Sequence, residues 1–354
     1  MKYHLVGHSG LKVSTLTLGT MTFGGKGNFA KTGNTDVAGA RRQIDMAMDA
    51  GVNMLDTADI YSSGESEEII GEALDAARRN KLLLATKVRF PTGDKSPNER
   101  GLSRHHIVKA CEASLKRLKT DHIDFYWCHE WDGQTPVEET LAAMDDLRRA
   151  GKIGYLGVSN YSGWHIMKML SAADASGLIR PIAQQIHYTL QAREAEYELL
   201  PLGVDQGVDA FIWSPLAGGL LSGKYRRGKP EPEGTRKAAH WDEPPVRDVE
   251  ALYDIIEVLF KVAERHEGAT PAQVALAWLL TRPGVTSVVV GARTDAQLTD
   301  NLKAATLVLS EDDVEELEKV SRPPLLYPYW HQASTAADRL SDSDLVLLEP
   351  FLKK

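Results

Sequence analysis

The sequence predicts an α/β protein of the (β/α)8 TIM barrel type, and three observations support this prediction. Eight short apolar runs alternate with helical patterns along the 354 residues. The runs lack strict polar–apolar alternation, as is typical of parallel strands buried on both faces. No change of composition divides the chain, so we expect one domain over 1–354, with an open doubly wound sheet as the alternative. The expected strands are 15–20, 53–57, 82–88, 122–130, 153–160, 182–189, 209–215 and 286–291.

Helix-start signals lie between these runs. Residues 135–138 (TPVE) have the spacing of a capping box, with Pro136 at the first helical position. Thr294 and Gln297 have the spacing of another capping box, and Ser103 can cap a further helix. The apolar residues after Ser103 follow the spacing of one helical face, at Ile107, Cys111, Leu115 and Leu118.

Three segments lie outside the eight repeating units. Residues 3–14 alternate in polarity and predict an N-terminal hairpin that closes the bottom of the barrel. Residues 218–249 form a long loop after the seventh strand, whose basic residues and glycines predict closure over a polyanionic ligand. Residues 323–354 form a tail that we expect on or near the barrel mouth. For the long loop and the tail, a surface insert without function is the alternative.

The stretch GKGNFA, residues 25–30, fits a dinucleotide-binding pattern of glycines but lacks its context. That pattern requires the glycines to open directly into a helix. Here the polar stretch KTGNTD follows, and we expect the helix to begin near Asp36. We therefore interpret 25–30 as part of a flexible loop over the substrate mouth.

Composition and charge exclude several classes of function. The chain is 43% hydrophobic and 25% charged, with a formal net charge of -8 and no basic block. Binding of nucleic acid or of an anionic membrane surface is therefore not expected. No stretch approaches the roughly 18 apolar residues of a membrane span, and the N-terminus lacks the apolar run of a signal peptide. Only two cysteines occur, Cys111 and Cys128, which fits a cytoplasmic protein.

Four polar side chains follow the ends of three consecutive expected strands. Asp56 ends the second strand and Tyr61 follows in its loop, while Lys87 ends the third strand and His129 the fourth. Barrels place their chemistry at the C-terminal ends of the strands, so we expect these side chains to converge. Each has a structural alternative when taken singly: a helix-capping acid, a packed phenol, a lysine at a strand end and a satisfied core histidine.

Together these side chains fit a proton donor. A free tyrosine has a pKa of about 10 and is a slow acid at neutral pH, but a neighbouring ammonium lowers that pKa. Lys87 is the expected cation, and Asp56 would keep it charged despite burial. His129 would donate a hydrogen bond to the substrate oxygen and set its angle. A lysine that forms a Schiff base is the alternative, which the paired Asp56 disfavours. The histidines show no metal-ligand pattern, so no metal site is expected.

Several stretches resemble motifs of the aldo-keto reductase family, and together they cover essentially the whole chain. They are LDTADIY, ATK, IDFYWCHEWD, GKIGYLGVSN, FIWSPLAGGLLSGKY and GARTDAQLTDNL. The resemblance implies reduction of aldehydes or ketones with NAD(P)H, on a barrel without a Rossmann domain. It also implies that Tyr61 gives the proton, that Lys87 and Asp56 tune Tyr61, and that His129 orients the substrate.

The same resemblance implies a cofactor site. Ser159, Asn160 and Gln185 would bind the nicotinamide carboxamide, and Trp213 would stack on the nicotinamide ring. One branch of the family has Lys-Ser at the adenosine phosphate, where this chain has Gly291-Ala292 followed by Arg293. NADP(H) is therefore expected through Arg293, with NAD(H) still possible. The expected cofactor contacts are Thr20, Met21, Asp56, Ser159, Asn160, Gln185, Trp213, Ser214, Leu216, Gly218, Lys224, Gly291, Arg293, Gln297 and Asn301.

Two functions remain open from the sequence. The first is an enzyme acting on a small carbonyl compound, with Trp127 and Trp131 expected in the substrate pocket. The second is a nucleotide-binding regulatory subunit on the same barrel with little turnover, like the channel-associated relatives of the family. The complete set of four polar side chains favours the enzyme.

Overall fold

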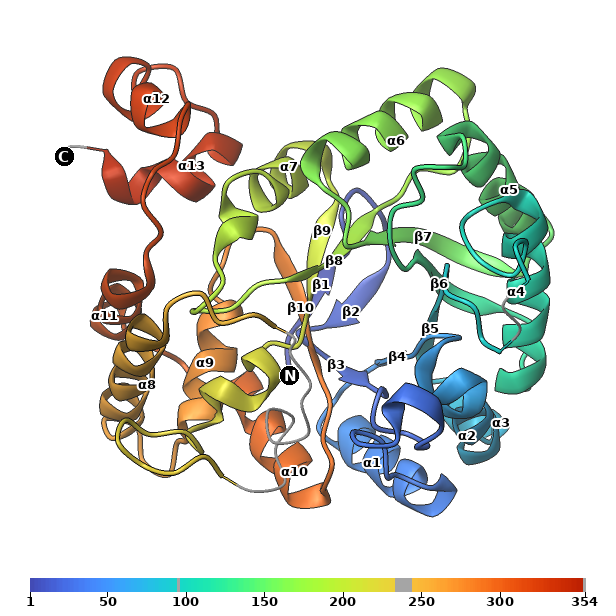
Figure 1. The fold of residues 1–354 in the computed structure, drawn as a ribbon, viewed down its shortest axis with the longest axis horizontal. Helices are drawn as coiled ribbons and strands as arrows, with labels where there is room; N and C mark the ends of the chain where they lie inside the picture. The colour runs from blue at the N-terminus through green and yellow to red at the C-terminus, as the bar shows by residue number, and fades with distance from the viewer. Residues whose placement is uncertain (94–95, 233–243, 353–354) are drawn as a thin grey trace.

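A closed barrel of eight parallel strands forms the centre of the molecule, in the order β10-β3-β4-β5-β6-β7-β8-β9 (Figure 1). The computed structural model describes residues 1–93, 96–232 and 244–352. The closed order confirms the predicted (β/α)8 barrel and excludes the open sheet. The strands are β3 (Leu16–Gly19), β4 (Met54–Asp56), β5 (Leu83–Val88), β6 (Ile123–Cys128), β7 (Ile153–Ser159), β8 (Ala183–His187), β9 (Asp209–Trp213) and β10 (Val285–Val290).

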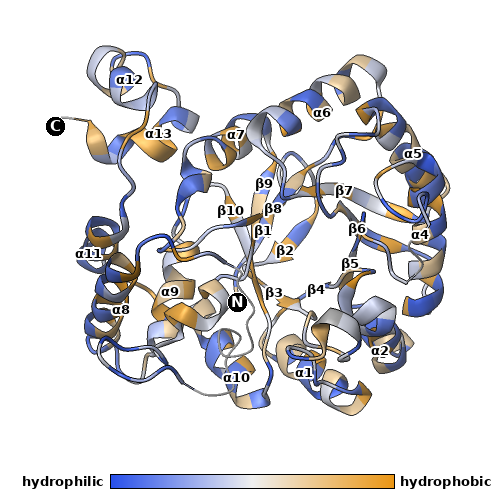
Figure 2. Ribbon diagram, in the orientation of Figure 1, coloured by the Kyte–Doolittle hydropathy of each residue, from blue (hydrophilic) through white to orange (hydrophobic). Residues whose placement is uncertain are grey.

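Helices with mixed hydrophilic and hydrophobic residues surround the strands (Figure 2). Such amphipathic helices cover the outer face of the barrel with their apolar side. They are α1 (Val37–Asp49), α2 (Glu65–Ala73), α3 (Ala76–Arg79), α4 (Arg104–Leu118), α5 (Val137–Arg149), α6 (Gly163–Ser176), α7 (Leu199–Gln206), α8 (Val249–Ala263), α9 (Pro271–Leu279), α10 (Asp295–Lys303) and α11 (Glu311–Ser321).

Some of the observed helices begin at the capping residues that the sequence predicts, and others do not. Ser103 caps α4 and Asp36 caps α1, so α1 begins where the sequence predicts. Thr294 caps α10, but the Gln297 side chain accepts from the backbone N–H of residue 293 rather than from that of Thr294. Thr135 does not cap α5, because its hydroxyl donates to Asp132 over 2.7 Å and the helix begins one residue later than expected.

Two apolar layers lie on the two sides of the barrel wall. One fills the space between strands and helices, and the other fills the barrel interior. Trp127 belongs to the interior layer and is fully buried against Phe125 and Phe211. Gly157, its register partner on β7, makes room for it, since a Cβ at Gly157 would lie 2.3 Å from the indole ring. The barrel is therefore a packed core beneath its mouth.

The N-terminal hairpin closes the lower end of the barrel as predicted. β1 (Tyr3–Leu5) pairs antiparallel with β2 (Lys12–Ser14). The Ser14 backbone donates to Asn53, just before β4, and the Gly7 backbone donates to Asp209 at the start of β9. Both partners mark the N-terminal ends of strands, so the opposite end of the barrel is left for the site.

The tail adds α12 (Tyr329–Thr335) and α13 (Asp342–Leu348) at one edge of the molecule (Figure 1). The sequence predicts the tail on or near the mouth, whereas α13 packs against α7 on the outer ring. Tyr197, just before α7, donates its hydroxyl to the Pro324 carbonyl over 2.5 Å and stacks on Tyr329. No described residue of the tail lines the mouth cavity. This part of the tail therefore covers a helix rather than the site.

Only the first part of the long loop after β9 falls within the described residues. Arg226 and Arg227 pair with Glu257 and Asp254 on α8, so they do not face the mouth. Residues 233–243, on which much of the predicted closure depends, lie outside the described residues. Among the described helices, none is both long and apolar enough to cross a membrane.

Candidate active site

A buried ion pair lies at the upper ends of β4 and β5. Lys87 Nζ is 2.5 Å from Asp56 Oδ2, 2.8 Å from the Thr57 carbonyl oxygen and 3.3 Å from the Tyr61 hydroxyl. The Lys87 side chain is fully buried. Burial alone lowers the pKa of Lys87, but the negative charges of Asp56 and of ionised Tyr61 outweigh it, so that the pKa is raised. Lys87 is therefore an ammonium group, and it lies against the Tyr61 oxygen.

Asp56 is held from the far side of the barrel as well. Gln185 Nε2 donates to Asp56 Oδ1 over 2.9 Å. Gln185 lies on β8, which is four strands from β4 in either direction around the barrel. The two carboxylate oxygens thus have different partners, and the Asp56 side chain bridges the interior between opposite strands. This arrangement fixes the carboxylate beneath the mouth.

The backbone after β4 presents Tyr61 through a tight turn. Ser62 and Ser63 both adopt left-handed backbone conformations, with φ of 51° and 57°. Residues rarely adopt this conformation unless their surroundings hold them there. Ser62 is held by its hydroxyl, which donates to the Phe23 carbonyl over 3.1 Å. The loop sequence is therefore built to hold Tyr61 in one position, next to Lys87.

His129 lies beside Tyr61, with 6.0 Å between the ring centroids, and its other neighbour is Phe90 at 5.0 Å. Burial lowers the pKa of His129 well below its usual range, and the positive charges of Lys87 and Arg89 lower it further. The imidazole is therefore neutral at physiological pH. A neutral imidazole keeps one N–H group that can donate to a ligand oxygen.

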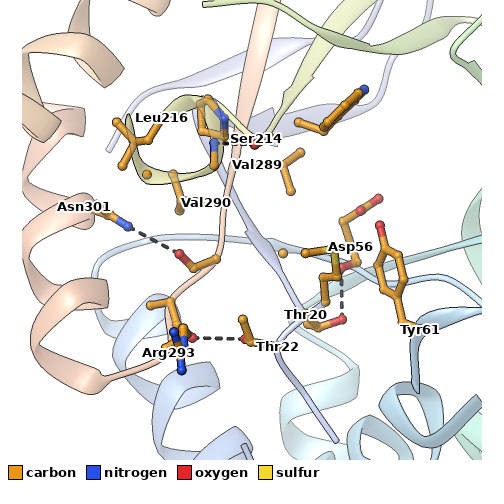
Figure 3. A pocket seen from close by; sticks show the side chains of 18 of the residues that line it. Thr20, Thr22, Asp56, Tyr61, Ser214, Leu216, Val289, Val290, Arg293 and Asn301 are labelled. Carbon is orange, nitrogen blue, oxygen red and sulfur yellow. Dashed lines mark hydrogen bonds between the residues drawn. The ribbon is translucent and has the colours of Figure 1, made fainter. Parts of the chain in front are cut away.

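These side chains face one cavity of about 1260 Å³ at the barrel mouth. Tyr61 and His129 line it, together with all fifteen residues expected to contact a cofactor, whereas Lys87 lies behind Tyr61. In Figure 3, Tyr61, Asp56 and Thr20 lie on one side of the cavity, and Arg293 and Asn301 lie on the other. The cavity therefore has the Tyr61 phenol on one side and the Arg293 guanidinium on the other.

The walls near β9 and β10 carry features suited to phosphate. Gly218 and Gly219 follow β9 in left-handed conformations, and the Gly218 N–H donates to the Ser214 hydroxyl over 3.0 Å. Glycine backbone of this kind lets a phosphate approach closely. Lys224 and Arg293 also line the cavity, and they follow the neighbouring strands β9 and β10.

Trp213, at the end of β9, is oriented by Asn160. The indole N–H donates to Asn160 Oδ1 over 3.0 Å, and Asn160 Nδ2 donates to the His129 carbonyl over 3.2 Å. Asn160 has a left-handed backbone with φ of 57°, which asparagine tolerates better than most residues. One amide therefore couples the position of the indole to the strand end that carries His129.

The structure corrects the expected substrate pocket. Trp127 belongs to the barrel core and does not line the cavity. Trp131 lies outside the cavity as well, because its ring stacks on His165 with 4.1 Å between centroids and packs against Tyr161. No pattern in the sequence indicated that the Trp131 ring would pack against α6 instead of facing the cavity.

Sequence reasoning missed four side chains around Tyr61 and His129. They are Phe29, Ile60, Phe90 and Glu130, all of which line the cavity. A signal existed for two of them, since Phe90 and Glu130 each follow the last residue of a strand by two positions. Phe29 lies on the loop that the sequence does predict over the substrate mouth.

Comparison with known proteins agrees with this geometry. The model of the Aldo/keto reductase family matches residues 15–322. The uncharacterized oxidoreductase YrpG of Bacillus subtilis (strain 168) is 39% identical over 335 residues, which cover 92% of this chain and 97% of that protein. A probable voltage-gated potassium channel subunit beta of Arabidopsis thaliana is 37% identical over 327 residues, covering 90% and 96%. A putative voltage-gated potassium channel subunit beta of Schizosaccharomyces pombe (strain 972 / ATCC 24843) is 36% identical over 328 residues, covering 90% and 92%.

The fold and these relatives thus define a barrel oxidoreductase, with its cavity at the C-terminal ends of the strands. The chain belongs to the aldo/keto reductase family. Members of this family generally use a nicotinamide cofactor.

Proposed function

We propose that the protein reduces aldehydes or ketones to alcohols with NADPH. The observation that carries this proposal is the Tyr61 hydroxyl, 3.3 Å from the buried Lys87 ammonium at the mouth of the barrel. An ammonium at this distance favours the phenolate and so makes the phenol a better acid. The neutral His129 beside it can donate a hydrogen bond to the carbonyl oxygen.

The residues around the cavity fit a nicotinamide dinucleotide. A volume of about 1260 Å³ exceeds the roughly 300–1,000 Å³ of pockets for drug-sized ligands. Asn160 and Gln185 would bind the nicotinamide amide, and the Gly218–Gly219 turn and Lys224 would bind the pyrophosphate. All of them line the cavity, which supports this assignment. Trp213 offers an aromatic ring held by its own hydrogen bond. When bound, the cofactor supplies the hydride.

Side chains of the protein then orient the substrate carbonyl and supply the proton. His129 and Tyr61 hold the carbonyl oxygen between them, and Tyr61 donates its proton to that oxygen as the alcohol forms. The phenolate left on Tyr61 is stabilised by Lys87, which Asp56 keeps charged and in place. A proton from solvent restores Tyr61, so the net change is addition of one hydride and one proton to the C=O group.

Replacement of the acid tests this mechanism. Tyr61→Phe should reduce kcat for carbonyl reduction by about 10²–10⁴-fold, the usual contribution of a general acid, with little change in cofactor affinity. Tyr3→Phe is the matched control, because Tyr3 lies in the hairpin at the opposite end of the barrel. A Tyr61→Phe variant that keeps near-normal kcat removes Tyr61 from the mechanism.

A preference for NADPH over NADH is the second part of the proposal, and Arg293 carries it. A guanidinium can bind the 2′-phosphate in a bidentate manner. The neighbouring acid Asp295 would oppose a phosphate, but it pairs with Arg42 on α1 at 3.2 Å. Its charge is therefore partly compensated, which supports the preference.

Dissociation constants for both cofactors test the role of Arg293. A charge-assisted contact contributes about 1.5–3 kcal/mol, so Arg293→Ala should weaken NADPH by about 10–150-fold. NADH lacks the phosphate and should change little. Equal losses for the two cofactors contradict the phosphate contact, and tighter NADH binding to the unmutated protein contradicts the preference.

A second candidate function is favoured by the relatives named as potassium channel beta subunits. In that case the protein would bind a nicotinamide nucleotide and associate with another protein, with little turnover. Steady NADPH consumption with a panel of aldehydes and ketones separates the two candidates. The cytoplasmic location stays a prediction.

A further inference from the structure

The basic side chains that line the cavity and the carboxylate of Glu130 follow different strands of the barrel. Among the described residues, five charged side chains line the cavity: Asp56, Glu130, Lys224, Arg293 and Asp300. Arg293 and Asp300 follow β10 and Lys224 follows β9, whereas Glu130 follows β6. β6 is four strands from β10 in either direction around the barrel. Glu130 therefore lies across the mouth from the basic groups.

The carboxylates at the mouth differ in their partners. Asp56 is bound by Lys87 and Gln185, and Asp300 accepts from Thr270 and Gln273. For Glu130, no hydrogen bond or ion pair with another described residue is found. Its side chain is half-buried and lines the cavity directly after His129. Its carboxylate is therefore available to a ligand that His129 orients.

The other groups near this end do not cancel its charge at the cavity wall. His129 is neutral because burial lowers its pKa well below the usual range. Arg89 directly follows β5, but its guanidinium lies over the Phe90 ring at 4.8 Å and does not line the cavity. Phe29, Ile60 and Phe90 make the remaining wall apolar. This end thus combines an apolar surface with one negative charge.

We propose that Glu130 determines substrate specificity by excluding carbonyl compounds that carry a carboxylate, so that the substrates are uncharged or cationic compounds with an apolar body. This inference rests on the proposed carbonyl reduction and specifies its substrate class. Glu130 directly follows His129, which lies beside Tyr61, so a carboxylate on that side of a substrate bound at Tyr61 would come close to Glu130. Like charges that meet in a site disfavour the wrong ligand as effectively as good contacts favour the right one.

Two aldehydes of similar shape measure this effect. They are 4-carboxybenzaldehyde, which is anionic at neutral pH, and methyl 4-formylbenzoate, which is uncharged. Like charges about 6 Å apart, at an effective dielectric constant of about 40, should lower kcat/KM about tenfold. The intrinsic reactivities of the two aldehydes differ, but that difference is the same for every variant and cancels when the ester-to-carboxylate ratios are compared.

Three variants are compared with the unmutated holoenzyme. Glu130→Gln should lower the ester-to-carboxylate ratio of kcat/KM about tenfold, and Glu130→Lys should lower it further. Glu138→Gln is the matched control, because Glu138 is exposed at the start of α5 and does not line the cavity. It should leave the ratio unchanged. Raising the salt concentration should reduce the discrimination of the unmutated protein, since a half-buried charge is partly screened.

The outcomes separate the inference from the function on which it rests. A ratio that is the same in the unmutated protein, Glu130→Gln and Glu130→Lys overturns the role of Glu130. Equal shifts in Glu138→Gln and Glu130→Gln overturn it too, because a general charge effect then explains the result. If neither aldehyde nor any other carbonyl compound is turned over, the proposed function itself fails, and the substrate inference fails with it.

Discussion

Removing Lys87 alone should destabilise the protein more than removing Lys87 and the charge of Asp56 together. In Lys87→Met the Asp56 carboxylate, 2% exposed, loses the ammonium at 2.5 Å and keeps only Gln185 as a side-chain partner. Breaking a buried pair from one side costs about 3–5 kcal/mol, because it leaves an uncompensated charge. We expect a loss of that size in the free energy of unfolding.

The double variant Lys87→Met/Asp56→Asn separates stability from chemistry. Asparagine keeps an oxygen that can accept from Gln185 and carries no charge to compensate. Replacing a buried pair by neutral groups is often close to neutral in stability, so most of the loss should be recovered. Activity should not recover, because the ammonium beside Tyr61 is still absent. Both variants should show kcat lowered by about 10²–10⁴-fold.

Urea unfolding followed by fluorescence, together with kcat for a reactive aldehyde, provides the two measurements. Asp56→Asn alone completes the cycle and gives the interaction energy of the pair. The reasoning is refuted if Lys87→Met costs less than about 1 kcal/mol, a loss typical of a surface pair. It is also refuted if the double variant regains activity along with stability, since Lys87 would then have a purely structural role.

Three further predictions concern the core, a buried network and pH. Gly157→Ala should cost at least about 1–3 kcal/mol because its Cβ would overlap an indole ring, whereas Gly10→Ala, with no atom within 4 Å, should be nearly neutral in thermal melts. Glu318→Gln should lower the melting temperature without changing cofactor affinity, because that buried carboxylate accepts from two arginines and an indole far from the cavity. His129 stays neutral when folded, so its contribution to stability is present above about pH 6.5 and is lost as pH falls below that value. His129→Gln should therefore lose less stability on acidification than the unmutated protein, and an equal loss in urea titrations at several pH values contradicts this.

Much of the barrel could be predicted because its signals are local. Each strand is a short apolar run, and caps such as Ser103 and Asp36 bond to N–H groups only three residues away. The cap expected at Thr135 failed for a tertiary reason, because Asp132 offers that hydroxyl a competing acceptor. The contacts of the tail are not local either, since Pro324 accepts from Tyr197, which lies 127 residues away.

Residues of the candidate site could be predicted where they stand at the end of a strand. They could not be predicted where packing against neighbouring elements decides which way a side chain points. Asp56 and Lys87 stand at strand ends, so topology alone brings them together. Trp131 stands just beyond a strand end too, but it packs on the start of α6 through His165. The choice between facing the cavity and facing a helix depends on neighbours from another unit of the barrel. No local pattern in a single sequence contains that information.

The period of two along a strand explains why Trp213 lines the cavity and Trp127 does not. Interior positions alternate, and they include Met54, Ala85, Phe125, Ala183 and Phe211, while Leu84, Tyr126, Val158 and Ile212 face the helices. Two residues further along, the same interior face carries Asp56 after Met54, Lys87 after Ala85, Gln185 after Ala183 and Trp213 after Phe211. On β6, Trp127 is the register partner of Lys87. The next position on the same face of β6 is His129, which lies closer to the mouth than Trp127. Trp127 is therefore core because its strand has one more interior layer, whereas Trp213 is the last interior residue of β9 and meets the cavity.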